Sequence, residues 1–168
     1  MRRMLIVGAV VFGLWYAFVG GRSIKETHVY DLYNEYWNAF AAGDSKTVCS
    51  LFDSEFSAVV RTRTPAGQVE EAAGKSQACE GTDKFFAMKK AMEEKAGEEL
   101  FINTEYTVDE IAISPDEKTA TVRVSSEVRI GTEKRLFLKI RESQTDKIVR
   151  SLGKARFIAT DGDISFGN

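Results

Sequence analysis

Few residues of this chain have the types and spacings that metal binding or catalysis requires. Its one histidine, His28, and its two cysteines, Cys49 and Cys79, are far apart in the sequence. A zinc site takes four ligands at short and regular spacings, so these three residues do not predict one. His28 lies at the start of the first predicted helix, where a solvated or helix-capping role is the commoner one for a histidine.

Two short motifs resemble ligand-binding loops but lack residues that such loops need. Gly74-Lys75-Ser76 ends like a phosphate-binding loop, yet Val69 occupies the first glycine position and two glutamates follow it. The segment Asp161-Gly162-Asp163 lacks the further oxygen ligands of a calcium loop. We interpret the first motif as loop and the second as turn, and we expect no cofactor and no metal.

Charge is distributed unevenly along the chain. Residues 70–117 hold 13 acidic and 5 basic residues, whereas residues 134–156 hold 8 basic and 2 acidic ones. Even spacing within each of two groups of basic residues predicts a shared strand face for each group. These candidate partner-binding residues are Arg135, Lys139 and Arg141, and Arg150, Lys154 and Arg156.

Two interpretations of this basic segment remain open. The basic face would dock an acidic partner or anionic lipid headgroups. Alternatively, it is a solvated outer face of a sheet, partly paired with Glu127 and Glu142, where each surface ion pair contributes about 0–1 kcal/mol. The net charge of the whole chain is −2, which excludes a generally basic nucleic-acid-binding protein.

The first 21 residues differ from the rest of the chain. Arg2 and Arg3 precede an uncharged, largely apolar run from Met4 to Gly21. Sixteen residues of helix reach roughly 24 Å, slightly less than the ~30 Å hydrocarbon core. We expect a retained single-pass anchor in the inner membrane, with the domain of residues 22–168 on the periplasmic side. A cleaved signal peptide and a buried helix of a soluble protein are the alternatives.

If the domain is exported, its two cysteines leave the reducing cytosol. An even cysteine count in a chain that leaves the reducing cytosol predicts a disulfide between Cys49 and Cys79. Two buried thiols that act as small apolar side chains are the alternative.

The side chains of any site must be held by helices and strands. In the first part of the domain, the apolar residues have helical periodicity. Aromatic residues at helical spacing predict a helix over residues 23–42, with Gly43 after its end and Asp44 capping a short second helix. Residues 56–63 predict a strand. We expect a turn at 65–67 and an irregular loop over 68–81. A third helix is then expected from Thr82 or Asp83 to Gly97, with Phe85, Phe86, Met88 and Met92 as its candidates for burial.

After Gly97 the period changes from 3.6 residues to 2, which predicts strands. The segment 102–113 predicts one long strand, and its apolar alternation slips at Asp109-Glu110, where a bulge would restore it. A turn is expected at 115–118. Further strands are expected over residues 122–130, 136–140, 147–159 and 164–166, with a turn at 161–162.

This order of elements predicts an α+β fold in which helices cover one face of a curved antiparallel sheet. At the first helix the chain resembles the nuclear transport factor 2-like (NTF2-like or SnoaL-like) superfamily, whose sheet and helices form a cone. The resemblance lies in Tyr36-Trp-Asn-Ala-Phe-Ala-Ala-Gly-Asp44, followed by Val48-Cys-Ser-Leu-Phe-Asp53. It implies an NTF2-like domain with about three helices; a cystatin-like or unrelated α+β layer is the alternative.

The resemblance also implies where an active site would lie. Isomerases of this superfamily use a tyrosine on the first helix, which matches Tyr36, and a carboxylate base on the first strand, which matches Val60. Because a valine takes no proton, the resemblance does not carry that chemistry to this chain. The candidates for lining a ligand cavity in the cone are Tyr36, Trp37, Phe56 and Tyr106.

Three classes of function fit these features. The favoured one is a membrane-tethered, non-catalytic interaction or assembly domain of the bacterial cell envelope, with itself or another envelope protein as partner. That layout is similar to the single-span NTF2-like scaffold subunits of type IV secretion machines. The second is a module that binds a small apolar ligand in the cone. The third is a divergent isomerase or dehydratase, which needs an ionisable group deep in the cavity.

Overall fold

The computed structural model describes residues 21–64 and 67–167, which form three helices and a sheet of six strands. Residues 4–20 of the predicted anchor and residues 65–66 of the predicted turn lie outside this part of the chain. Within the described residues, no helix is both long enough and apolar enough to cross a bilayer.

The helices are α2 (Glu26–Ala41), α3 (Ser45–Ser50) and α4 (Lys75–Ala96). His28 caps α2, as predicted, because its Nδ1 accepts a hydrogen bond from the Lys25 N–H at 3.0 Å. After α2 the chain reverses at Gly43, whose φ of +72° favours glycine. Asp44 then caps α3 by accepting the Thr47 N–H at 3.0 Å, so both ends of this predicted corner are confirmed.

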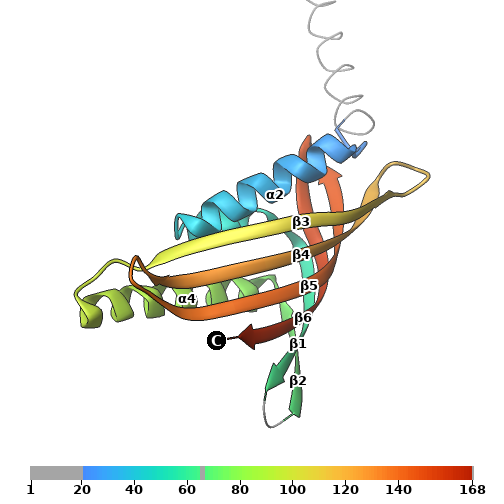
Figure 1. Cartoon of the computed structure of the whole chain (residues 1–168). Helices are drawn as coiled ribbons and strands as arrows, with labels where there is room; N and C mark the ends of the chain where they lie inside the picture. The colour runs from blue at the N-terminus through green and yellow to red at the C-terminus, as the bar shows by residue number, and fades with distance from the viewer. Residues whose placement is uncertain (1–20, 65–66, 168) are drawn as a thin grey trace, which may run out of the picture.

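The sheet has the order β2-β1-β6-β5-β4-β3, and of these neighbours β1 and β6 run parallel whereas the others are antiparallel. Its strands are β1 (Phe52–Thr64), β2 (Gly67–Gly74), β3 (Phe101–Ile113), β4 (Thr119–Thr132), β5 (Arg135–Ser151) and β6 (Lys154–Gly167). Figure 1 shows the sheet curling around the helices, which lie on one of its faces. The predicted bulge in β3 is confirmed at Asp109, which the pairing with β4 skips.

The core fills the space between the helices and the inner face of the sheet. On β4 the even-numbered residues from Ala120 to Ile130 are all buried, and α2 contributes buried Val29, Leu32, Tyr33 and Trp37. This strict alternation follows from the two-residue period of a strand with one covered face. The resulting cone agrees with the fold that the resemblance predicts.

The predicted irregular loop at 68–81 is wrong. Residues 67–74 form β2, which pairs with β1 from Thr64↔Gly67 to Ser57↔Gly74. The helix α4 therefore starts at Lys75 rather than near Thr82. Its start is stabilised by Gln77, whose Oε1 accepts the Gly74 N–H at 2.6 Å. Small and polar residues suit this exposed edge strand, so they carried no apolar signal.

The burial predicted for α4 is correct in part. Phe85 and Phe86 are half-buried and contact the ring of Phe40 at centroid distances of 5.3 and 5.4 Å. Met88 and Met92, however, are 52% and 39% exposed. The helix contacts α2 through its paired phenylalanines, and the two methionines that follow them stay exposed.

The predicted strand at 147–159 and the predicted turn at 161–162 are also wrong. The long strand β5 continues to Ser151, and the chain reverses at Leu152 and Gly153, with φ angles of +51° and +80°. The strand β6 then passes through Asp161 and Gly162, which pair with Thr145 and Gln144. Apolar residues on both sides of the reversal concealed it in the sequence.

Candidate functional site

A cavity of about 110 Å³ lies inside the cone, between α2, α4 and the inner face of the sheet. The aromatic rings and small side chains of its wall come from the helices and the sheet, and its other polar side chains come from β5 and β6. The lining residues are Tyr36, Phe52, Phe56, Ala58, Ala78, Glu142, Gln144, Asp146, Phe157 and Thr160.

The strand alternation of β5 places its polar residues in this cavity. Ile140 and Ile148 face the core and pair with Val128 and Ala120 of β4. Between them, positions 142, 144 and 146 share the same parity and so share the same face. The inner row of β5 therefore changes from apolar to polar in its middle third and back again.

Asp146 is the most deeply buried of these groups, at 1% exposure. Its Oδ2 accepts hydrogen bonds from the Tyr33 hydroxyl at 2.5 Å and from Gln144 Nε2 at 2.7 Å. Its Oδ1 accepts one from the Thr160 hydroxyl at 2.7 Å. Burial raises the pKa of Asp146, and the three donors act against that rise by stabilising the carboxylate. Asp146 thus anchors a hydrogen-bonded network that joins α2, β5 and β6.

Glu142 lies four residues before Asp146 on the same face of β5, and it has far fewer hydrogen-bond partners. The Ser126 hydroxyl is 3.5 Å from Glu142 Oε2, at the outer limit of a hydrogen bond. Burial and the nearby Asp146 raise the pKa of Glu142 to about 7. Two carboxyl groups in one apolar enclosure resist being ionised together, so Glu142 can take or release a proton near neutral pH.

Aromatic rings form the remainder of the wall. Tyr36 contacts Phe157 at a centroid distance of 5.5 Å, and Phe52 stacks on Phe56 at 4.3 Å. Burial raises the pKa of Tyr36, as do Glu142 and Asp146, so its hydroxyl stays protonated. Among the ten residues that line the cavity there is no lysine, arginine or histidine.

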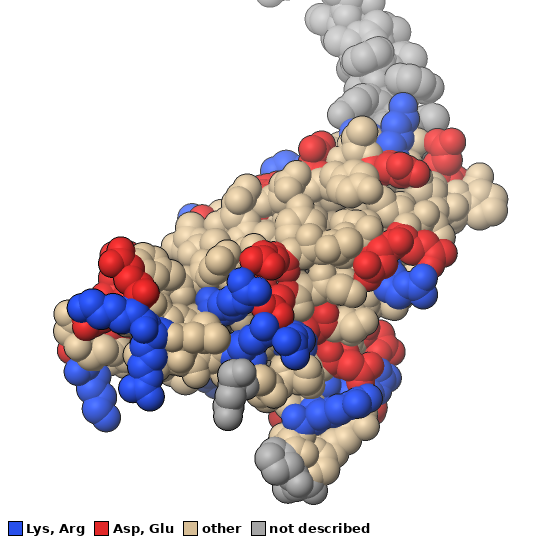
Figure 2. Space-filling model, viewed as in Figure 1, with Lys and Arg blue, Asp and Glu red and all other residues tan. Residues whose placement is uncertain are grey.

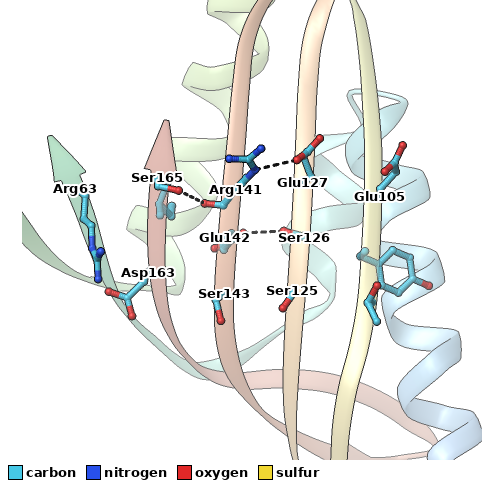
Figure 3. A pocket seen from close by; sticks show the side chains of 13 residues that line it. Arg63, Glu105, Ser125, Ser126, Glu127, Arg141, Glu142, Ser143, Asp163 and Ser165 are labelled. Carbon is cyan, nitrogen blue, oxygen red and sulfur yellow. Dashed lines mark hydrogen bonds and ion pairs between the residues drawn. The ribbon is translucent and has the colours of Figure 1, made fainter. Parts of the chain in front are cut away.

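A second hollow, of about 480 Å³, lies over the opposite face of the sheet. Figure 3 shows its side chains: Arg141 contacts Glu127, and Arg63 points toward Asp163. Lys139, Arg141 and Arg129 donate to Glu127 and lower its pKa to about 2. The basic side chains around Glu127 are therefore paired with its carboxylate.

Two of the four predicted cavity residues, Tyr36 and Phe56, line the inner cavity. Trp37 is buried beside it and stacks on Tyr106 at a centroid distance of 5.9 Å, and its Nε1 finds no hydrogen-bond partner among the described residues. Tyr106 instead borders the outer hollow and donates to Asn34 Oδ1 at 2.6 Å.

The six predicted partner-binding residues do not gather on one surface. Lys139 and Arg141 pair with Glu127 at 2.9 and 3.1 Å, and Arg135 lies over the ring of Phe137. At the other end of β5, Arg150 donates to the Ser23 carbonyl at 2.9 Å. Lys154 and Arg156 border a different hollow, beside His28 of α2.

The space-filling view agrees with this separation. In Figure 2 basic and acidic side chains lie next to one another over the sheet, without a continuous basic patch. The arrangement matches the interpretation of this face as a solvated surface. Glu142 is half-buried and borders both the outer hollow and the inner cavity.

The predicted disulfide is confirmed: Cys49 of α3 is bonded to Cys79 of α4, with a Cα–Cα distance of 5.4 Å. Cys79 follows Ala78, which lines the cavity. The bond thus fixes the first turns of α4 over the cavity. Among the described residues, no three histidine, cysteine or acidic side chains gather as metal ligands would.

Sequence reasoning missed Glu142 and Asp146, the two groups that give the cavity its chemistry. They are the two acidic residues of the basic segment 134–156. Their parity with Leu138 and Ile140 was the available signal, because it continues the apolar row inward. Val60, the position of the base in related isomerases, is half-buried against the core and remains without chemistry.

Comparisons with known proteins support the fold. No family model and no curated protein matches the chain. Among solved structures, a conserved protein from Planctomyces limnophilus matches with a TM-score of 0.60 and 15% identity, over 84% of this chain and 97% of that one. An NTF2-like protein of unknown function from Shewanella baltica matches with a TM-score of 0.53 and 10% identity, over 83% and 92%.

A ketosteroid isomerase-like protein from Erwinia carotovora also matches, with a TM-score of 0.53 and 13% identity, over 82% of this chain and 94% of that one. At such identities the similarity is one of fold. The chain therefore has an NTF2-like α+β fold, and its function has to be argued from its own residues.

Proposed function

We propose that this domain binds a small molecule in the cone cavity and is held at the bacterial inner membrane, on its periplasmic side, by residues 4–21. The observation that carries the proposal is the pair Glu142 and Asp146 facing an aromatic-walled cavity. Isolated polar groups in a core reduce stability unless they are fully paired, and Glu142 has one distant partner. A ligand that pairs with Glu142 would offset this cost.

Concave sites with mostly apolar walls and a few convergent polar groups are typical of small-molecule binding. The charged surfaces support binding less well, because the outer-face charges pair with one another. Glu142 and Asp146 also supply the ionisable groups that a divergent enzyme would need. The cavity is therefore equipped for proton transfer to a bound ligand as well as for binding.

Native mass spectrometry of the full chain, purified in mild detergent, tests this proposal. We expect the wild-type chain to show the added mass of a bound small compound. The compound is either retained through purification or bound when the chain is exposed to compounds of up to about six non-hydrogen atoms. The Ala78→Leu variant fills the cavity and should carry none. If both chains show only their own bare masses under all these conditions, the proposal is overturned.

Assembly through the outer face of the sheet is the second candidate function. The observation that favours it is a hollow of about 420 Å³ bordered by Phe101 and Leu136, which are 45% and 49% exposed. Between them lies Gly131, where a side chain would collide with the backbone of Arg135 and Leu136. Exposed apolar patches of this kind are common at contacts between subunits.

The same spectra test assembly. A second copy of this chain seated on the hollow predicts a dimer that the Leu136→Glu variant loses and the Ala78→Leu variant keeps. A wild-type chain that stays monomeric across the micromolar range would contradict it.

A further inference from the structure

The charge balance of the cavity restricts what it can bind. Its ten lining residues include two carboxyl groups and no basic side chain. Lys75, the basic residue that starts α4, does not line the cavity, and its Nζ already donates to the Phe52 carbonyl at 2.6 Å. An anionic ligand would face two acidic groups with no counter-charge, which low-polarity surroundings make costly.

The two carboxyl groups play different parts. Asp146 already accepts three hydrogen bonds, from Tyr33, Gln144 and Thr160. Among the described residues, the one hydrogen-bond donor to Glu142 is the Ser126 hydroxyl, at 3.5 Å. Its carboxylate is therefore the free acceptor, and a cation beside it would form the missing ion pair.

The rings around Glu142 complement the carboxylate. Phe157 contacts Tyr36 and Phe52 at centroid distances of 5.5 and 6.1 Å, and Phe56 extends the wall by stacking on Phe52. Ring faces attract a cation placed within about 6 Å of the centroid, and aromatic enclosures bind alkylated ammonium groups in this way. An alkylammonium ion would satisfy both walls at once, with its charge on Glu142 and its methyl groups on the rings.

Volume sets the size of the ligand. The cavity measures about 110 Å³. A protein cavity of about 150 Å³ holds one benzene molecule. A ligand of roughly five non-hydrogen atoms therefore fits without movement of the walls.

Resting on the proposed function, we propose that the cavity selects a small alkylammonium ion, paired with Glu142 and enclosed by Tyr36, Phe52, Phe56 and Phe157. The selectivity comes from charge and ring contacts together. A neutral molecule of the same shape keeps the apolar contacts but leaves the Glu142 carboxylate without a counter-ion.

Two probes of matched size test this inference: tert-butylammonium and tert-butanol, each with five non-hydrogen atoms. Nuclear magnetic resonance titrations of the full chain in detergent micelles at pH 8 would give both dissociation constants. We expect the ammonium ion to bind at least tenfold more tightly than the alcohol. The Glu142→Gln variant should lose that preference, whereas Glu55→Gln, which removes an exposed carboxylate from β1, should keep it.

A Phe56→Leu variant provides a second test that leaves the carboxylates in place, and we expect it to reduce the preference for the ammonium ion severalfold. If the alcohol binds as well as the ammonium ion and Glu142→Gln changes nothing, this inference fails while the proposed binding site stands. If neither probe nor any other small compound binds the wild-type chain, both fail.

Discussion

At the scale of single residues, Glu142 and Asp146 show how one strand can hold two carboxyl groups for different purposes. Asp146 is fixed by three donors and joins α2 to β5 and β6. Glu142 has little support and a pKa raised to about 7 by burial and by Asp146. We interpret the first as structural and the second as the group that meets a ligand.

This difference predicts how stability depends on pH. Because the pKa of Glu142 rises from its ordinary 4.5 to about 7 on folding, the folded chain binds more protons than the unfolded chain between these values. The free energy of unfolding should therefore fall as the pH rises from about 5 to 7, by about 3 kcal/mol at most. Asp146, whose pKa burial also raises, contributes with the same sign.

Urea unfolding at pH 5, 6, 7 and 8 measures the effect. Glu142→Gln should remove most of this slope and make the chain more stable than the wild type at pH 8. Tyr33, Tyr36 and Ser126, which face the carboxyl pair, stay neutral over this range, so they add no slope. A wild-type chain that gains stability relative to the variant between pH 5 and 8 would contradict the assignment.

At the scale of elements, α4 is attached to the domain by few strong contacts. None of its residues is fully buried, and its half-buried contacts are Ala78, Cys79, Phe85 and Phe86. The Cys49–Cys79 bond therefore carries much of the attachment. Since Ala78 lines the cavity, the bond also bears on the shape of the site.

Removing the disulfide should lower the stability and weaken ligand binding together. The bond spans 30 residues, for which loop-closure entropy gives roughly 3.5 kcal/mol. We expect reduction by dithiothreitol to lower the midpoint of thermal unfolding and to loosen binding of the probes. The Cys49→Ser/Cys79→Ser double variant should match the reduced chain and no longer respond to dithiothreitol; a wild type indifferent to reduction would refute this.

The elements also show how far the sequence predicts the structure. The corner at Gly43 and Asp44 and the bulge at Asp109 were predictable, because each follows from local backbone chemistry or from a slip in alternation. The strand β2 was not, since an exposed edge strand of small and polar residues has no apolar period. The reversal at Leu152 was hidden by apolar residues on both sides of it.

That hidden reversal had a consequence for the site. Dividing β5 before Lys147 interrupts the inward row that runs from Leu138 through Glu142 to Ile148. Without that row, the sequence predicts that Glu142 lies on the surface and pairs with nearby arginines. The cavity aromatics Tyr36 and Phe56 were predictable from the resemblance, whereas the carboxyl groups required the register of a three-dimensional sheet.

At the scale of the whole molecule, the start of the domain is fixed against two turns. The Gly153 N–H donates to the Gly21 carbonyl at 3.0 Å, and the Ile24 N–H donates to the Glu117 carbonyl at 2.7 Å. Figure 1 places this contact at the end of the domain where the chain enters. A membrane anchor preceding Gly21 would thus hold the domain close to the bilayer with little freedom to turn.

Extraction of membranes with alkaline carbonate tests the proposed anchor. We expect the full chain to remain in the membrane pellet, because an apolar span resists extraction. Changing Val10 and Leu14 to aspartate should release the chain to the soluble fraction, since a charge at the centre of a span costs about 2.5–3.5 kcal/mol on insertion scales. A full-length wild-type chain found in the supernatant would rule out a retained anchor.

The central claim is that Glu142 lines the cone cavity where a ligand can reach it, and the titration of Glu142 itself tests this claim most directly. The carboxyl carbon of Glu142 can be followed by ¹³C nuclear magnetic resonance in the full chain from pH 4 to 9, with and without tert-butylammonium. We predict a midpoint near 7 for the free chain, falling when the ammonium ion is added. A midpoint near 4.5 that the probe does not move would show a solvated carboxylate and contradict the account.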